Sequence, residues 1–313
     1  MGFDVVGLGC SALDYLGIVP RCPRLDEKIE MLNFTRQGGG PVATALVALS
    51  RLGASTSYVG KVGDDEAGKF ILREFEKEGV DTSGVVIEKG ASSLVAFCVA
   101  EKNTGKRTIF WHRGTCSGLD PRELNKQLIL SAKFLHLDGH EIRAAIEAAK
   151  WAKAKKIDPV RHVDRTKSNG VKVVLDPDLN LPEMEELVKL TDILIAPSNF
   201  ARDFTKEEDY SKAAEKLFAL GPEVVVITLG EKGCLCRSGK GMFTKPAFRV
   251  KVVDTTGAGD VFHGAFVYGL LRGWDLEKTA EFSNAASAIK CTKLGGRAGI
   301  PTLKQVEEFL ASR

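Results

Sequence analysis

Short, strongly apolar runs alternate with helix-like segments along most of this 313-residue chain, and that alternation limits the folds open to it. The strand-like runs cover residues 5–8, 57–59, 134–137, 171–175, 193–195 and 224–228. The helix-like segments cover residues 41–52, 67–78, 141–155, 261–271 and 279–290. Such alternation predicts a mainly parallel central sheet with helices on both faces. Ligands of such sheets bind beyond the carboxyl ends of the strands, so the segments that follow the runs are where a site is expected.

Two segments break this rhythm and have the pattern of antiparallel strands instead. They are residues 29–35, and residues 92–101 with 106–112, where Asn103-Thr104-Gly105 is a turn signal. We expect a small second β-sheet, formed discontinuously by about residues 14–36 and 90–116, within a single α/β domain that spans residues 1–313. Residues 157–170 are polar and charged, and they predict a surface loop.

Composition excludes several classes of protein. The net charge is +3 (44 basic minus 41 acidic residues) with no long basic block, so nothing indicates a nucleic-acid partner. The longest apolar runs are far too short to cross a membrane, and the N-terminus lacks a signal-peptide pattern. Seven cysteines without paired spacing favour reduced thiols in the cytoplasm.

Three small residues stand directly before a carboxylate in Gly257-Ala258-Gly259-Asp260, and a helix-like run follows. A helix that begins there points uncovered backbone N–H groups outward at the positive end of its dipole, which makes a phosphate site. Asp260, in the first turn, is placed to act as a base beside that phosphate. Phosphoryl transfer to a hydroxyl fits this arrangement, and an ordinary glycine turn with an acidic first helical turn is the alternative.

Residues 254–266, Asp-Thr-Thr-Gly-Ala-Gly-Asp-Val-Phe-His-Gly-Ala-Phe, resemble the C-terminal signature of the ribokinase-like (PfkB) carbohydrate kinases almost without a break. The resemblance implies that Asp260 is the catalytic base and that the amides of Gly257, Ala258 and Gly259 form the anion hole. It also implies a ribokinase-like fold in which the small sheet is a lid that excludes water from the phosphoryl group. A homodimer formed through the lid is a further expectation.

The same resemblance implies an acceptor site near the N-terminus. Gly38-Gly39-Gly40-Pro41 begins a stretch similar to the family's N-terminal signature, so Gly39 and Gly40 are expected at a lid hinge that approaches the sugar closely. Thr44 stands where the family has a substrate-binding Asn, and this departure concerns the substrate. Asp14 follows the first strand-like run and is expected to accept hydrogen bonds from sugar hydroxyls. A plain turn and a solvated Asp14 are the alternatives.

The lid run ends in Trp111-His112-Arg113, which could line a pocket for an anionic sugar. Strand alternation sends His112 to the opposite face from its neighbours. Arg113 is therefore the candidate substrate ligand, with a surface position as the alternative.

Residues 228–233, Thr-Leu-Gly-Glu-Lys-Gly, match the family's nucleotide-phosphate loop and imply that Thr228, Gly230 and Gly233 bind ATP. A hairpin turn is the alternative, and both interpretations hold together in this family. Asn284 falls where the adenine edge lies in the family, although an Asn on a helix surface is the simpler expectation.

Ion binding is less clearly indicated. The resemblance implies a monovalent cation, K+, bound by Asp254 and the Thr256 carbonyl. Mg2+ is expected because phosphoryl transfer from ATP needs charge neutralisation. The family's Asn-x-x-Glu motif is not intact, however, because Asn199 is followed at the third position by Arg202 and then by Asp203. The upstream Asp176-Pro177-Asp178 is the candidate replacement.

The segment from Lys290 to Pro301, with the triple glycine and Thr44, is more similar to the sulfofructose kinase branch than to ribokinase itself. It contains Arg297, which either binds the substrate or a phosphate or is an ordinary surface residue; the sequence leaves both alternatives open. Thr44, Arg113 and Arg297 together tilt the expected acceptor toward an anionic ketose.

The sequence therefore predicts an ATP- and Mg2+-dependent sugar kinase. A kinase of a neutral sugar, nucleoside or vitamin alcohol stays open, as does a catalytically weak sugar-binding regulator on the same fold. Residues 7–12, Gly-Leu-Gly-Cys-Ser-Ala, formally fit a dinucleotide fingerprint, but that motif needs a helix directly after it, and none is expected here.

Overall fold

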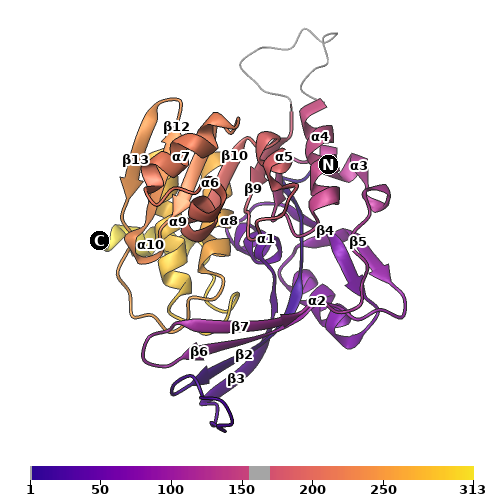
Figure 1. Cartoon of the computed structure of the whole chain (residues 1–313), viewed down its shortest axis with the longest axis vertical. Helices are drawn as coiled ribbons and strands as arrows, with labels where there is room; N and C mark the ends of the chain where they lie inside the picture. Colours follow the sequence, from indigo (N-terminus) through magenta and orange to yellow (C-terminus); the bar gives the residue numbers. More distant parts are fainter. Residues whose placement is uncertain (1, 155–169) are drawn as a thin grey trace.

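The chain builds one large sheet and one small sheet in a computed structural model that describes residues 2–154 and 170–313 (Figure 1). The large sheet has nine strands in the order β13-β12-β11-β10-β9-β8-β1-β4-β5. Neighbours from β11 to β5 are parallel, whereas β12 and β13 run antiparallel at one edge. Its strands are β1 (Val5–Leu8), β4 (Thr56–Gly63), β5 (Asp81–Glu88), β8 (Phe134–Leu137), β9 (Lys172–Leu175), β10 (Ile193–Pro197), β11 (Val224–Thr228), β12 (Cys234–Ser238) and β13 (Gly241–Lys245).

Helices cover both faces of the large sheet. They are α1 (Pro41–Arg51), α2 (Glu66–Lys77), α3 (Lys126–Leu130), α4 (Ile142–Ala154), α5 (Met184–Lys189), α6 (Ser198–Thr205), α7 (Tyr210–Ala219), α8 (Ala258–Leu271), α9 (Leu276–Lys290) and α10 (Leu303–Ala311). One apolar core lies between the sheet and α1, α2, α8, α9 and α10, and a second lies between the opposite face and α3 to α7. Two buried faces explain why the strands read as continuous apolar runs.

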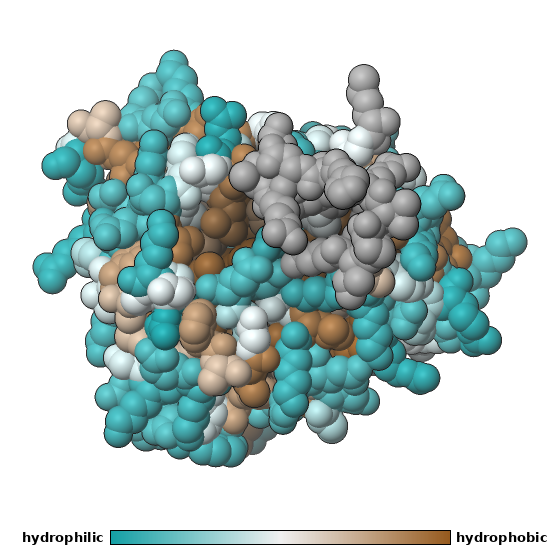
Figure 2. Space-filling view, turned by 90° about the horizontal axis from the view of Figure 1, so that it is seen from above, coloured by the Kyte–Doolittle hydropathy of each residue, from teal (hydrophilic) through white to brown (hydrophobic). Residues whose placement is uncertain are grey.

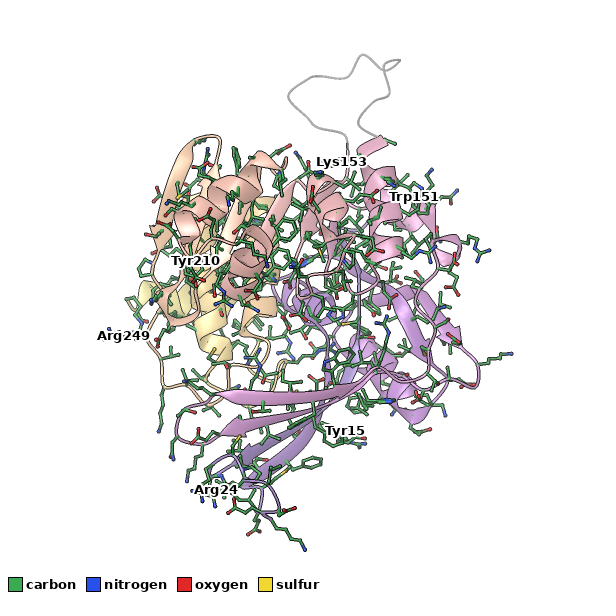
Figure 3. The ribbon with its side chains drawn as sticks, viewed as in Figure 1. Tyr15, Arg24, Trp151, Lys153, Tyr210 and Arg249 are labelled. Atoms are coloured by element: carbon green, nitrogen blue, oxygen red, sulfur yellow. The ribbon has the colours of Figure 1, made fainter. Side chains whose placement is uncertain are left out.

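The small sheet has four strands in the order β3-β2-β6-β7, and it lies below the large sheet in Figure 1. Its strands are β2 (Ala12–Val19), β3 (Asn33–Gly39), β6 (Val95–Glu101) and β7 (Arg107–His112). Aromatic side chains gather on its outer side, where the Tyr15 and Phe97 rings stack with centroids 5.0 Å apart, and Phe97 pairs with Phe110 on the next strand. Figure 3 shows Tyr15 on this sheet and Arg24 on the loop beyond β2.

The predicted ribokinase-like α/β class, with a large mostly parallel sheet and a smaller second sheet, is confirmed. The predicted helices are also present, although α8 begins at Ala258, three residues before its predicted start, and α9 begins at Leu276. The predicted helix over 141–155 is α4, and its last predicted residue lies outside the described part. The predicted loop over 157–170 also lies outside the described residues, apart from Gly170.

Two strand assignments need revision. Asp14 follows β1, as predicted, but it lies within a further strand, β2, that the sequence pattern did not reveal, and the alternative of a solvated Asp14 is wrong. The predicted strand over 29–35 is shifted, because β3 begins at Asn33 and continues through Gly39. The glycines therefore extend the strand and leave it only at Gly40, whose φ of 97° turns the chain into α1.

The strand order reverses direction at β1, which places a crevice at its carboxyl end. β1 pairs with β4 on one side and with β8 on the other, and the chain winds outward from each. Such switch points are where open α/β sheets bind ligands. β2, not a helix, follows the glycines after β1, which removes the dinucleotide-binding alternative.

The surface in Figure 2 is mainly hydrophilic, with apolar side chains visible between the charged ones. Among the described residues, no helix is long and apolar enough to span a membrane.

Candidate active site

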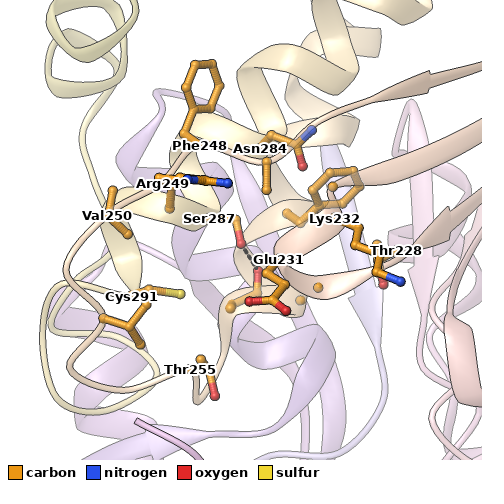
Figure 4. A pocket seen from close by; sticks show the side chains of 18 of the residues that line it. Thr228, Glu231, Lys232, Phe248, Arg249, Val250, Thr255, Asn284, Ser287 and Cys291 are labelled. Carbon is orange, nitrogen blue, oxygen red and sulfur yellow. Dashed lines mark hydrogen bonds between the residues drawn. The ribbon is translucent and has the colours of Figure 1, made fainter. Parts of the chain in front are cut away.

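Two cavities open near the carboxyl ends of the parallel strands. The larger, of about 910 Å3, extends from the loop after β11 to the start of α8 (Figure 4). The smaller lies at the switch point, beside Gly9, Cys10 and Ser11. The Tyr58 hydroxyl donates to the Gly9 carbonyl at 2.8 Å and fixes the chain where it leaves β1.

All four residues expected to bind ATP line the larger cavity, namely Thr228, Gly230, Gly233 and Asn284. Gly230 begins a single 3-10 turn, and Gly233, at φ 93°, leads into β12. The simpler expectation of a surface Asn284 is wrong, because its side chain is 5% exposed and donates to the carbonyls of Lys245 and Pro246. The loop and the amide thus lie at one cavity, whose size suits a nucleotide.

The Gly-Ala-Gly turn presents free backbone donors to the same cavity. Gly257 caps α8 with φ 75°, and among the described residues the N–H groups of Gly257, Gly259 and Asp260 have no acceptor. The Ala258 N–H, by contrast, donates to the Thr255 carbonyl at 3.2 Å. Figure 4 shows the Ser287 hydroxyl donating to the Ala258 carbonyl at 2.8 Å, which anchors this turn to α9. The free donors at a helix N-terminus make an anion site.

Asp260 lies in the first turn of α8 among other carboxylates. Burial raises its pKa well above the ordinary range, and the charge of Asp176 raises it further, while Arg107 opposes the shift. A carboxyl with a raised pKa holds a proton more readily than an ordinary Asp, which suits a group that must take one from a hydroxyl.

Arg107 was missed by the sequence reasoning. It comes from β7 of the small sheet, lines the larger cavity and donates to Thr255 Oγ1 at 3.1 Å. Its hydrogen bonds among the described residues go to the carbonyl and hydroxyl of Thr255, which are neutral, so its charge is available to a phosphate. The strand alternation that identified Arg113 also places Arg107 on the same face, so this pattern could have identified Arg107 from the sequence.

The two glycines at the end of β3 make room for the protein's own side chains. A Cβ on Gly39 would lie 2.2 Å from the Asp14 carboxylate, and one on Gly38 would lie 2.2 Å from the Arg297 guanidinium. Burial raises the pKa of Asp14 to about 6, although the charge of Arg297 opposes this. Asp14 and Arg297 therefore pack against these two glycines, and close approach of a sugar at Gly39 and Gly40 stays a prediction.

Arg297 and Thr44 are both buried and support the site from behind. Arg297 is 2% exposed, so a surface position is wrong; its guanidinium lies 5.1 Å from the centroid of the Phe75 ring. Thr44 is 1% exposed and faces Gly296, which in turn lies against Gly257. Neither residue lines the two cavities.

Three basic side chains gather at the smaller cavity: Lys61, Arg113 and His140. Arg113 pairs with Glu141 at 3.2 Å, and Lys61 pairs with Glu123 at 2.7 Å. Burial alone lowers the pKa of His140, but a hydrogen bond to Asp178 and the charge of Asp138 outweigh it and raise the pKa to about 9. His140 is therefore charged at neutral pH. His112 pairs opposite Val95 on the outer face, as the strand alternation predicted.

The segment expected to bind a monovalent cation is held by the protein itself. Asp254 is 1% exposed; its carboxylate accepts from the N–H and hydroxyl of Thr256, both at 2.8 Å, and from the Gly295 N–H at 2.7 Å. Lys290, which is fully buried, donates its ammonium to the Asp254 carbonyl at 2.8 Å. A fixed positive charge thus lies at the base of the anion-binding turn.

The altered Asn-x-x-Glu segment lies on α6. Asn199 is exposed there, and Arg202 forms an ion pair with the adjacent Asp203 at 3.0 Å. None of these residues lines either cavity. Asp176 and Asp178, by contrast, act electrostatically on Asp260, as does Asp14.

Comparison with known proteins assigns the chain to a family. Residues 4–303 match the pfkB family carbohydrate kinase model, and the chain belongs to this family. An uncharacterized sugar kinase of Archaeoglobus fulgidus is 34% identical over 82% of the chain and 98% of that protein. A 5-dehydro-2-deoxygluconokinase of Clostridium perfringens is 28% identical over 98% of the chain and 93% of that protein. A putative ribokinase from Agrobacterium tumefaciens has the same fold, with a TM-score of 0.89 at 27% identity over 100% of the chain and 98% of that structure. The chain is thus a carbohydrate kinase, a phosphotransferase with an alcohol acceptor.

Two glycines of the anion-binding turn predict opposite effects of adding one methyl group. Gly257→Ala places a Cβ 2.8 Å from the Gly296 backbone in a residue with φ 75°, so we expect a loss of about 1–3 kcal/mol in unfolding free energy. Gly259→Ala meets no atom within 4 Å and lies in a helix, so the fold keeps its stability or gains up to about 1 kcal/mol. Because Gly259 lines the larger cavity, this variant should nevertheless weaken binding of a non-hydrolysable ATP analogue in calorimetry. Unchanged affinity in Gly259→Ala would remove the turn from the nucleotide site.

The charged state of His140 predicts a dependence of stability on pH. Its folded pKa of about 9 exceeds the unfolded value of about 6.5, so its stabilisation is complete below pH 6.5 and is lost as pH rises through 9. The wild type should lose on the order of 3 kcal/mol more unfolding free energy over this interval than His140→Gln, measured by urea denaturation. The exposed His112→Gln variant is the control and should follow the wild type. If the unfolding free energies of the wild type and of His140→Gln changed with pH in parallel, the raised pKa of His140 would be contradicted.

Proposed function

We propose that this carbohydrate kinase transfers the γ-phosphate of ATP to a hydroxyl of a sugar that carries an anionic group. The observation that carries the proposal is the position of Asp260. This carboxylate lies in the first turn of α8, directly after Gly259, whose free N–H lies at the wall of the larger cavity. A base and an anion site one residue apart are what an in-line transfer to a hydroxyl requires.

In the proposed step, the acceptor hydroxyl gives its proton to Asp260 while its oxygen bonds to the γ-phosphorus. The bond between that phosphorus and the β,γ-bridging oxygen breaks, and ADP leaves with the electron pair. The N–H groups of Gly257 and Gly259 stabilise the negative charge on the transferring group, and Arg107 adds a positive charge from the small sheet. Asp14 is proposed to orient the acceptor's hydroxyls, close to Gly39 and Gly40.

The proposed nucleotide site extends from this turn to the loop after β11. Thr228, Gly230 and Gly233 are placed to bind the phosphates through backbone and hydroxyl groups, with Asn284 farther along the cavity. Mg2+ bound to ATP neutralises phosphate charge, and it is usually held by one or two carboxylates plus phosphates and waters. The donor set fits this: Asp178 acts electrostatically on Asp260, and its side chain is 56% exposed and therefore accessible.

The basic groups of the smaller cavity support an anionic acceptor. Arg113 and His140 both line this cavity, and the Arg113 side chain is 49% exposed, so its ion pair with Glu141 is open to exchange on the Arg113 side. A carboxylate, sulfonate or phosphate on the substrate could replace Glu141 as the partner of Arg113 at small cost. The relative from Clostridium perfringens is named for a gluconate-derived acceptor, which is also an acid. A sulfosugar, as the sequence motifs suggested, belongs to the same class.

An acceptor screen with a base-deficient control tests this function. Purified protein, ATP and Mg2+ are mixed with ketoses, sugar acids, sulfosugars, sugar phosphates, neutral sugars and nucleosides, and ADP release is measured. We expect turnover with an anionic sugar, and Asp260→Asn should lower kcat by about 100-fold or more while the ATP analogue still binds. Near-normal turnover in Asp260→Asn would remove Asp260 as the base. Sugar binding without turnover would identify a regulator.

Arg113→Gln tests the charge of the acceptor separately from the reaction. If Arg113 binds the anionic group, KM for the acceptor should rise by about 10-fold or more while kcat changes little, because the removed contact is made equally in the ground and transition states. Activity on a neutral sugar, if any is found, should not change. A preference for neutral acceptors in the wild type would overturn this part of the proposal.

Potassium was an expectation from the resemblance, and we propose that Lys290 takes its place. The buried ammonium already lies on the Asp254 carbonyl, beneath the anion-binding turn. Turnover should therefore change less than twofold when K+ is replaced by tetramethylammonium, whereas Lys290→Met, which keeps the length and removes the charge, should be strongly impaired. A severalfold activation of the wild type by K+ would restore the potassium site.

We further propose that the small sheet acts as the lid and that two copies of the chain associate through its outer face. Exposed aromatic residues of this size, gathered on one face, are typical of association surfaces. Phe34, Phe97 and Phe110 are 56%, 49% and 65% exposed. All seven cysteines are free, which supports a reducing compartment such as the cytoplasm.

A further inference from the structure

A buried cluster of two histidines and one aspartate lies outside both cavities. His136 comes from β8, Asp176 directly follows β9, and His263 comes from α8, one helical turn beyond Asp260. Their exposed fractions are 0%, 5% and 3%. One possible ligand atom from each residue lies within 4.8 Å of the other two. Three elements distant in the sequence thus bring their polar groups to one point inside an otherwise apolar layer.

The ring nitrogens of this cluster lack partners. Neither Nδ1 nor Nε2 of His136 has a hydrogen-bond partner among the described residues, and the same holds for Nε2 of His263. His263 Nδ1 lies against the Asp176 carboxylate. Buried polar atoms nearly always have a partner, since leaving one unsatisfied costs on the order of 1–3 kcal/mol. Several such atoms that face one another indicate a bound species between them.

The chemistry of the donors indicates what that species is. Each histidine offers an imidazole nitrogen and Asp176 offers a carboxylate oxygen, and these three atoms converge on one point. Neutral imidazole is the commonest metal ligand in proteins and suits Zn2+, Fe2+ and Co2+, whereas Mg2+ prefers oxygen ligands. A water molecule could satisfy some of these atoms, but two imidazoles and a carboxylate that converge in this way also match the ligand set of a metal ion.

We propose that His136, Asp176 and His263 bind one divalent transition-metal ion, such as Zn2+, at a site separate from the Mg2+ of ATP. Two imidazoles and one carboxylate are a common three-residue set for such ions, with metal–ligand distances of about 2.0–2.2 Å. Such metal–ligand distances place tetrahedral donor atoms about 3.3–3.6 Å apart. On binding, a separation of 4.8 Å would therefore shorten by about 1 Å or more, and the His263–Asp176 contact would lengthen to admit the ion, which requires side-chain rotations. The ion would fasten α8, and with it the turn that carries Asp260, to the ends of β8 and β9.

Metal binding can be measured without nucleotide, acceptor or turnover, so this proposal and the proposed kinase reaction fail independently. The full chain is stripped with a chelator, dialysed against metal-free buffer and titrated with Co2+ or Zn2+. We expect one equivalent to bind, with visible Co2+ absorption bands typical of nitrogen and oxygen ligands. His136→Asn, His263→Asn and Asp176→Asn should each weaken binding at least about 100-fold, since even outer-shell partners are worth 10–100-fold.

Two controls separate this site from other metal-binding groups. His112→Gln removes an exposed histidine, and Cys234→Ala removes a buried thiol that neighbours Cys236; both should bind like the wild type. If a ligand variant does not fold, anomalous diffraction at the zinc edge from wild-type crystals tests the location directly. Absence of Co2+ and Zn2+ uptake by the wild type, a peak elsewhere, or equal binding by the three ligand variants would overturn the proposal.

Discussion

The hydrogen bonds of the buried Asp254 carboxylate hold the site together. One oxygen accepts from Thr256 and shapes the turn that leads into α8, while the other accepts from Gly295. The link to Gly295 fixes the start of the segment that carries Arg297. The Arg297 guanidinium lies against Gly38 of β3, and its charge opposes the rise that burial causes in the pKa of Asp14. A single carboxylate thereby connects the turn before α8 with the segment that packs against β3 of the small sheet. Its loss would disturb both.

The fold could largely be predicted because its central strands and its long helices have strong patterns. β1, β8, β10 and β11 are buried on both sides, and their sequences are nearly continuous apolar runs. The apolar residues of α2 recur at helical spacing, whereas α8 is buried along most of its length. β2 escaped detection because Asp14 and Gly17 interrupt its apolar pattern. Asp14 is tolerated there because it faces the glycine of β3 and the charge of Arg297, contacts from residues distant in the sequence.

The candidate site was predictable where a local motif defines it and unpredictable where tertiary contacts do. Gly257, Gly259 and Asp260 form their donor-and-carboxylate arrangement within four residues, and the Thr228–Gly233 loop follows its own strand. Lys290 and His140 are different, because each becomes informative only through a partner far along the chain. Arg107 is intermediate, because strand alternation places it on the same face as Arg113 but only the fold brings it to Thr255. Lys290 reaches the Asp254 carbonyl, and His140 acquires its charge from Asp178. No periodicity in the sequence identifies such pairs.

α8 explains why chemistry and packing cannot be separated in this molecule. Nine consecutive residues, from Val261 to Gly269, are buried, so the helix is surrounded by the sheet, α1 and α9 and cannot shift as a whole. Asp260 and His263 are three positions apart and therefore lie on one side of the helix. A species that contacts His263 and Asp176 would therefore also influence the orientation of Asp260, one turn earlier on the same helix. The cluster of His136, Asp176 and His263 is thus linked to Asp260 through α8, although the cluster lines neither cavity.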